Sequence, residues 1–201
     1  VLFRSMNANP FTNGHKYLVE TAAKACHILH VFVLSTDSSE FPSGVRLELV
    51  KQGCAHLPNV FVHGSSDYLI SHATFPDYFL KEKATATEKA AVLDLQIFGT
   101  YFKKAFHITQ RFVGEEPFST ITRAYNEQMK KILPAFDIKV TEIPRCQKNN
   151  TIISATFVRQ KFLEGDFSLL KDFVPETTYA FLISPAGNEL RNHLLTTGAI
   201  L

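Results

Sequence analysis

Short apolar runs alternate along this chain with longer segments in which apolar residues recur at helical spacing. The short runs are rich in β-branched and aromatic residues, which is typical of buried strands in a parallel sheet. They predict strands over residues 1–3, 28–34, 60–62, 108–113 and 138–143. The periodic segments predict helices over residues 14–26, 45–56, 85–98 and 121–133, and a last helix from an N-cap at Ser154 to Gly165. Thr85 with Glu88 fits a capping box at the start of the third helix.

Strands that alternate with helices indicate an α/β domain, and we expect a mainly parallel, five-stranded sheet with helices on both faces. Ligands of such sheets bind beyond the carboxyl ends of the strands. The polar segments that follow the first, fourth and fifth strands should therefore meet at one edge. Residues 1–184 are predicted to form this domain. Periodicity is weak after Ser184, which predicts a C-terminal tail of uncertain order over residues 185–201.

Composition narrows the class of protein without naming a function. A chain of 201 residues with 45% hydrophobic content suits one well-buried domain. Its net charge of +2 is too small to indicate a nucleic-acid or membrane partner, and no long apolar run predicts a membrane span. No signal-peptide pattern opens the sequence. The 3 cysteines are far apart, so we expect neither a disulfide framework nor a zinc site, and a cytoplasmic location.

A polar turn joins the first predicted strand directly to the first helix: Asn9-Pro10-Phe11-Thr12-Asn13-Gly14-His15. Helix N-termini carry unpaired backbone N–H groups and the positive end of the helix dipole, which favours anions there. Thr12 and His15 add a hydroxyl and an imidazole to the same place. Many such turns only cap a helix, and this pattern alone leaves that alternative open. We interpret the turn as a nucleotide-phosphate site.

A second helix start has similar chemistry. Ile153-Ser154-Ala155-Thr156 opens the last predicted helix, and Arg159 follows about one turn along. Hydroxyls at a helix N-terminus with an arginine fork form a phosphate clamp, although a lone example is more often a simple serine cap beside a surface arginine. The presence of both motifs in one chain favours a triphosphate site held from two sides.

Longer stretches connect this chain to a known family. They are residues 6–15, the S-D-Y-x-I-S-x-A-T-F-P block at residues 66–76, Val113-Gly114-Glu115-Glu116-Pro117 and Ile143-Pro144-Arg145. The two short motifs resemble the (H/T)-x-G-H and I-S-x-T/S-x-x-R patterns of the nucleotidyltransferase superfamily. Within it, the chain is similar to the catalytic domain of the citrate (pro-3S)-lyase ligase family over nearly its whole length. The resemblance implies a Rossmann-like nucleotidyltransferase fold.

The resemblance also implies a reaction. ATP with Mg²⁺ and acetate would give acetyl-adenylate and pyrophosphate, and the acetyl group would pass to a thiol prosthetic group on the acyl-carrier subunit of citrate lyase. Thr12 and His15 would hold the α- and β-phosphates, while Ser154, Thr156 and Arg159 would hold the leaving pyrophosphate. The chain departs from the family in residues 146–151, which lack an expected glycine. Full-length members usually carry an acetyltransferase-like domain before this one.

Further candidates follow from position and from the resemblance. Arg46 opens the second helix, where it would either reach the phosphates or be a solvated residue. Arg145 follows the fifth strand, and Gly114 and Glu115 stand where the superfamily places adenosine. The family-specific block offers three low-ranked substrate ligands: Asp67, Tyr68 and Ser71. No residue is named as a metal ligand.

Two other functions stay open at this point. One is an adenylyltransferase that acts on a pantetheine-phosphate-like or other phosphorylated acceptor. The other is an ATP-binding module without turnover. The sequence gives no Ser-His-Asp or Cys-His spacing that would indicate a covalent mechanism through a side chain.

Overall fold

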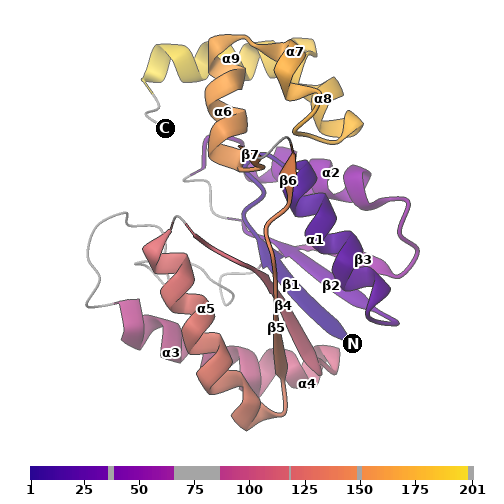
Figure 1. Ribbon diagram of the computed structural model, residues 1–201, viewed down its shortest axis with the longest axis vertical. Coiled ribbons are helices and arrows are strands. Elements are labelled where there is room, and N and C mark those ends of the chain that lie inside the picture. The colour runs from indigo at the N-terminus through magenta and orange to yellow at the C-terminus, as the bar shows by residue number, and fades with distance from the viewer. Residues whose placement is uncertain (36–38, 66–86, 118, 149–150, 199–201) are drawn as a thin grey trace.

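The computed structural model describes residues 1–35, 39–65, 87–117, 119–148 and 151–198. Its centre is a parallel sheet with strand order β3-β2-β1-β4-β5 (Figure 1). The strands are β1 (Leu2–Met6), β2 (Leu29–Val33), β3 (Val60–Gly64), β4 (Gln110–Gly114) and β5 (Lys139–Ile143). All five predicted strands are confirmed, with ends shifted by a few residues. The order places β1 in the middle, so the turn after it lies at the centre of the carboxyl edge.

Helices cover both faces of the sheet, as predicted. On one face lie α1 (Asn13–Lys24) and α2 (Ser43–Cys54). On the other lie α3 (Thr87–Ile97), α4 (Lys103–Phe106) and α5 (Thr120–Ile132), with a π-helical turn at Phe98–Phe102 and a 3₁₀ turn at Leu133–Phe136 (Figure 1). The predicted cap at Thr85 lies outside the described residues.

Alternation along the strands divides the core into two layers. In β1, Leu2 and Met6 pack with α1 and α2, whereas Phe3 packs with α3 and α5. Successive side chains of a strand point to opposite faces, so a strand buried on both sides needs apolar residues at almost every position. Arg4, in the same strand, is buried as well. A buried charge in a central strand is costly, so Arg4 indicates a candidate functional position in the sheet.

A third layer of helices lies beyond the sheet. It contains α6 (Ala155–Glu164), α7 (Phe167–Leu170), α8 (Glu176–Leu182) and α9 (Pro185–Thr197), which share a separate apolar core with Phe41. Figure 1 shows this layer at the end of the molecule away from the N-terminus. The backbone N–H of Asn13 donates to the carbonyl of Phe173 at 2.9 Å, which ties the layer to the start of α1. The carboxyl edge of the sheet is therefore roofed by the C-terminal residues.

The structure differs from the sequence prediction in this layer. The segment after Ser184, expected to have uncertain order, begins with α9, which runs to Thr197. Ser184 caps it by accepting from the backbone N–H of Gly187 at 3.1 Å, and Gly198 ends it with φ of 63°. Arg191 donates to the carbonyls of Phe162 and Leu163, both at 2.7 Å. Polar contacts anchor α9, and its apolar stripe is too narrow to show in the sequence.

The connection between β5 and α6 also has structure that the sequence did not predict. The strands β6 (Gln147–Lys148) and β7 (Thr151–Ile152) pair as a short antiparallel ladder. The carbonyl of Cys146 accepts from the backbone N–H of Ile153 at 3.2 Å. The link that lacks the expected glycine therefore contains a paired segment, which is followed directly by Ile153 and the Ser154 cap.

Candidate functional site

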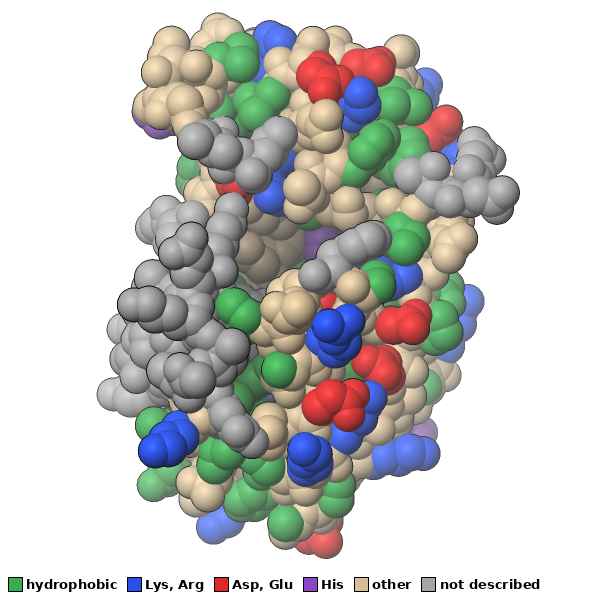
Figure 2. All heavy atoms as spheres, turned by 60° about the vertical axis from the view of Figure 1, so that its left-hand side comes forward, with side chains coloured by type: hydrophobic (Ala, Val, Ile, Leu, Met, Phe, Trp, Pro, Cys, Tyr) green, Lys and Arg blue, Asp and Glu red, His purple; other side chains and the backbone are tan. Residues whose placement is uncertain are grey.

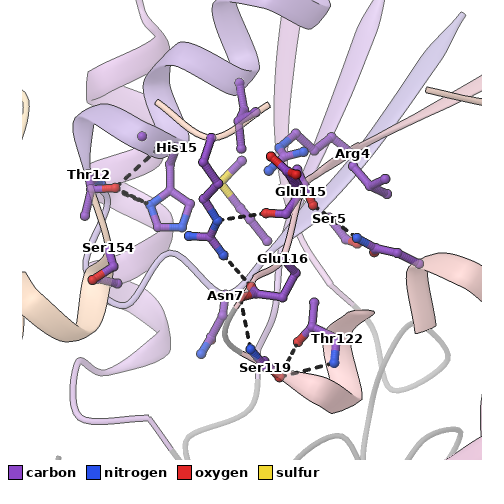
Figure 3. Close-up of a pocket in the computed structure, with 18 of the residues that line it drawn as sticks. Arg4, Ser5, Asn7, Thr12, His15, Glu115, Glu116, Ser119, Thr122 and Ser154 are labelled. Carbon is purple, nitrogen blue, oxygen red and sulfur yellow. Dashed lines mark hydrogen bonds and ion pairs between the residues drawn. The ribbon is translucent and has the colours of Figure 1, made fainter. Parts of the chain in front are cut away.

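A cavity of about 350 Å³ opens at the carboxyl edge of the sheet. Figure 2 shows the surface hollowed between the C-terminal helices and the body of the sheet, and Figure 3 shows residues that line this cavity. The polar lining comes from β1 and β4, from the residues that follow β1, β4 and β5, and from the N-terminal parts of α1, α5 and α6: Arg4, Ser5, Asn7, Thr12, His15, Arg111, Glu115, Glu116, Ser119, Thr122, Tyr125, Asn126, Arg145, Ser154 and Thr156.

Thr12 and His15 form a reciprocal cap at the start of α1. Thr12 Oγ1 accepts from the backbone N–H of His15 at 3.3 Å, and His15 Nδ1 accepts from the backbone N–H of Thr12 at 3.1 Å. This is the geometry of a capping box, with an imidazole where glutamate usually stands. Because Nδ1 accepts a backbone proton, the neutral ring carries its own proton on Nε2. The cap therefore fixes the tautomer of a cavity residue.

The surroundings of His15 keep it uncharged. Burial, followed by the positive charges of Arg4 and Arg145, lowers the pKa of His15 from 6.5 to about 3. Two arginines that disfavour an imidazolium create a positive potential, which favours a bound anion at the same point.

The first turn of α1 contacts Ile153, the residue just before the N-cap of α6. A β-carbon at Gly14 would lie 3.1 Å from the carbonyl oxygen of Ile153, so glycine allows this close approach. Ser154 Oγ caps α6 by accepting from the backbone N–H of Phe157 at 3.1 Å. Thr12, His15, Ser154 and Thr156 line one cavity, so the structure brings the two predicted motifs together.

The wall opposite is built from the ends of β4 and β5. Arg145 Nε donates to the carbonyl of Glu115 at 2.8 Å, and its Nη2 pairs with the carboxylate of Glu116. Glu116 also accepts from the backbone N–H of Ser119 at 3.1 Å. Gly114 lies beside them, with the Leu18 side chain 2.9 Å from where its β-carbon would be. The predicted residues Gly114, Glu115 and Arg145 thus share this wall.

Arg159 lies just behind the cavity, and its side chain is already engaged. Its Nη1 donates to the carbonyl of Asn9 at 2.7 Å, its Nε lies 3.2 Å from the Glu40 carboxylate, and its Nη2 lies 3.4 Å from Thr156 Oγ1. The amide of Asn9 in turn pairs with Glu40 and accepts from the backbone N–H of Phe41. Asn9 and Arg159 therefore join the turn after β1 to α6, and neither is among the residues that line the cavity.

Three other predicted residues are structural. The Arg46 guanidinium is fully buried and donates to the carbonyls of Phe41 at 2.9 Å and Asn7 at 2.8 Å. It is neither solvated nor part of the cavity lining, so we withdraw it as a phosphate ligand. Phe11 packs in the core against Gly53, and Pro10 follows a cis peptide bond after Asn9. Phe11 and Pro10 shape the turn and place Thr12.

Sequence reasoning missed several of the cavity residues. They are Arg4, Ser5, Asn7, Arg111, Ser119, Thr122, Tyr125 and Asn126. One signal was present: Arg4 and Arg111 are charges next to the apolar residues of buried strands. The sequence could not say whether such a charge points into a cavity or along a sheet edge. Asp67, Tyr68 and Ser71 lie outside the described residues.

Neither a metal cluster nor a membrane helix is found in the part of the chain that the structure describes. No group of three or more His, Cys, Asp or Glu side chains is placed there to hold a metal ion. No described helix is long and apolar enough to cross a membrane.

Known proteins have sequences similar to this one. The model of the family described as "Citrate lyase ligase C-terminal domain" matches residues 4–182. The chain belongs to this family. The citrate (pro-3S)-lyase ligase of Escherichia coli is 43% identical over 182 residues, which are 88% of this chain and 52% of that protein. Its counterpart in Haemophilus influenzae is 44% identical over 182 residues, 88% of this chain and 54% of that protein.

The citrate lyase ligase relatives are longer than this chain, which spans about half of their length. Among solved structures, a bifunctional NMN adenylyltransferase/ADP-ribose pyrophosphatase of Francisella tularensis, complexed with AMP and a manganese ion, superimposes with a TM-score of 0.55 at 13% identity. That match covers 97% of this chain and 53% of the other. It confirms the Rossmann-like nucleotidyltransferase fold that the resemblance implied.

Proposed function

We propose that this chain is the catalytic domain of an ATP-dependent acetate ligase that acts on citrate lyase. It would activate acetate as acetyl-adenylate and acetylate the thiol prosthetic group of the acyl-carrier subunit. Family membership supports the reaction class. The observation that carries the proposal is the contact of two capped helix N-termini, α1 and α6, on one cavity with a positive potential.

Thr12, His15, Ser154 and Thr156 hold the triphosphate in this proposal. Each first turn presents backbone N–H groups and the positive end of a helix dipole. The proton on His15 Nε2 makes the neutral ring a donor, and it stabilises the charge that develops on the α-phosphate oxygens. A preorganised donor of this kind is worth about 3 kcal/mol of transition-state stabilisation.

Arg159 acts on the leaving pyrophosphate in this proposal, and its guanidinium also contacts the Glu40 carboxylate and the carbonyl of Asn9. The phosphates compete with Glu40 for the guanidinium. Gly114 and Glu115 offer backbone groups to the adenosine, and Arg145 supports that wall.

Mg²⁺ would neutralise charge on the phosphates in this site. Because the described cavity residues form no cluster of metal ligands, the ion would be held mainly by phosphate oxygens and water, as Mg²⁺ commonly is. We name no protein ligand for it. The cytoplasmic location stays a prediction.

The chemistry needs placement more than a base. A carboxylate oxygen of acetate forms a bond to the α-phosphorus while the bond to the bridging oxygen breaks and pyrophosphate leaves. The nucleophile is already ionised at neutral pH, so alignment and charge stabilisation supply the rate. The thiol sulfur then bonds to the acetyl carbon, AMP leaves, and the thiol proton passes to solvent.

The test is incubation of the protein with ATP, Mg²⁺ and one acceptor at a time, with pyrophosphate measured and products identified by mass spectrometry. We expect acetate-dependent pyrophosphate release and a product with the mass of acetyl-adenylate. If 4'-phosphopantetheine gives an adenylylated product and acetate gives none, the protein is instead an adenylyltransferase. ATP binding by calorimetry without pyrophosphate from any acceptor would make it a module without turnover.

A further inference from the structure

The buried arginine of β4 is the least explained group in the cavity. Arg111 is 1% exposed and lines the cavity, yet no role has been assigned to it. A buried charge is costly unless it is paired and hydrogen-bonded. Arg111 makes no ion pair with a described carboxylate, and its Nη1 has no hydrogen-bond partner among the described residues. The guanidinium therefore has a buried donor without a partner among the described residues, beside a cavity that Arg111 helps to line.

The neighbours of the Arg111 guanidinium fix its position but do not occupy all of its hydrogen-bond donors. The ring centroids of Phe98, Phe3 and Tyr125 lie 4.5, 5.3 and 5.6 Å from its central carbon. Nη2 makes long contacts of 3.4 Å with Ser5 Oγ and with Tyr125 Oη. Aromatic faces stabilise a cation through their quadrupoles and leave its N–H groups available. Arg111 is thus fixed in place and retains donors for a ligand.

A second buried charge balances Arg111 indirectly. The Tyr125 hydroxyl donates to Asp94 Oδ2 at 2.5 Å and accepts from Arg111, so the tyrosine stands between the two charges. Asp94 is 1% exposed. This arrangement places Asp94 beyond Tyr125, away from direct pairing with Arg111. An anion can then bind to Arg111 without displacing an ion-pair partner.

The position of Arg111 separates it from the phosphate clamp. Its ring contacts belong to the core layer of α3 and α5, whereas Arg4 and His15 lie with α1 on the other face. The same cavity is also lined by Val113 and Met129, which belong to this core layer and offer apolar surface. A planar fork beside apolar side chains suits a small carboxylate with a short alkyl group.

We propose that Arg111, with Ser5, binds the carboxylate of the acid substrate, and that Tyr125, whose hydroxyl proton goes to Asp94, positions the guanidinium. The identity of the acid at this subsite rests on the proposed function. The residues of the subsite are described residues that line the cavity. It makes Arg111 a specificity-determining residue: Val113 and Met129 limit the alkyl chain, and the fork selects a carboxylate over a neutral group.

The kinetic test compares Arg111→Lys, which keeps the charge and loses the fork, with Arg123→Lys on the exposed side of α5 as the matched control. We expect Arg111→Lys to raise the KM for acetate about tenfold or more, the discrimination of one good bidentate contact, while the calorimetric Kd for ATP changes less than threefold. Tyr125→Phe and Ser5→Ala should each raise the acetate KM by a smaller factor. Arg123→Lys should change neither constant.

A structural role for Arg111 gives a different pattern. Equal loss of ATP affinity and acetate affinity, or a lower melting temperature with an unchanged acetate KM, would overturn the proposal. Should Arg111→Lys fail to fold, the split between the two constants in Tyr125→Phe and Ser5→Ala decides it in the same way.

A binding experiment separates this proposal from the proposed function. Saturation-transfer NMR with sodium acetate on the wild-type protein and Arg111→Lys, with sodium chloride as the ionic control, needs no turnover. Acetate contact that is lost in Arg111→Lys supports the subsite even if wild-type protein releases no pyrophosphate, an outcome that would refute only the ligase reaction. Acetate contact unchanged by the substitution would overturn the subsite even if the ligase reaction is observed.

Discussion

His15 combines a structural and a chemical task in one ring. Nδ1 completes the cap of α1, and the Nε2 proton is left to the cavity. Glutamine at this position keeps a hydrogen-bonding side chain but cannot place a donor at the same point. We expect His15→Gln to lower turnover about 100-fold or more, as loss of an oxyanion donor does, and to leave ATP binding measurable. A variant with normal turnover and reduced stability would restrict His15 to the cap.

The lowered pKa of His15 also makes a prediction for stability. Between pH 6.5 and about 3 the unfolded chain binds a proton that His15 in the folded protein does not bind. The free energy of unfolding therefore decreases as the pH is lowered through this range. Lowering the pH from 6.5 to 5.5 costs about 1 kcal/mol of stability. Urea unfolding of wild-type protein and His15→Gln at pH 7.5 and 5.5 should show a loss at pH 5.5 that is smaller in the variant by this amount. His30 and His63, whose pKa values burial also lowers, remain in both proteins and cancel.

Glu40 is predicted to restrain Arg159. Its carboxylate and the phosphates of ATP attract the same guanidinium, so Glu40→Gln removes a competitor and keeps an oxygen for Asn9 or Arg159. We expect ATP to bind about threefold more tightly in Glu40→Gln, as for the loss of one partly screened ion pair. Calorimetry with Arg159→Lys as a companion measures this. Weaker ATP binding in Glu40→Gln would show that Glu40 instead positions Arg159 for the nucleotide.

At the scale of elements, the junction of α1 and α6 sets the spacing of the clamp. A methyl group at Gly14 would meet the carbonyl of Ile153 at 3.1 Å and push the two helix starts apart. Gly14→Ala should therefore weaken ATP binding about tenfold although alanine favours the helix itself. Isothermal calorimetry together with thermal unfolding separates the two effects. Gly44→Ala in α2, where the added methyl meets nothing within 4 Å, is the matched control.

Local signals explain which elements were predictable. Ser154 and Gly165 delimit α6 as expected, because a cap and a positive φ of 81° at glycine act within one turn of the chain. The roles of Arg46 and Arg111 were not predictable in the same way. Both contact segments distant in sequence, and only the packing of those segments decides whether a guanidinium meets a carbonyl, a ring or a cavity.

At the scale of the whole molecule, nucleotide binding should join parts of the chain that lie far apart in sequence. Thr12 and His15 belong to the first helix, whereas Ser154 and Thr156 belong to the C-terminal layer. Hydrogen exchange followed by mass spectrometry should show ATP protecting backbone amides in both helix starts together. Protection confined to the turn after β1 would place the nucleotide outside the two-sided clamp.

The bond from Arg159 to the carbonyl of Asn9 spans 150 positions of the chain. A ribosome adds residue 9 long before residue 159. The turn after β1 can therefore form its hydrogen bond with Arg159 only after 150 further residues have been added. Contacts of such long sequence separation form late because loop closure costs entropy first. Nucleotide affinity is consequently a property that a growing chain acquires only after residue 159 has been synthesised.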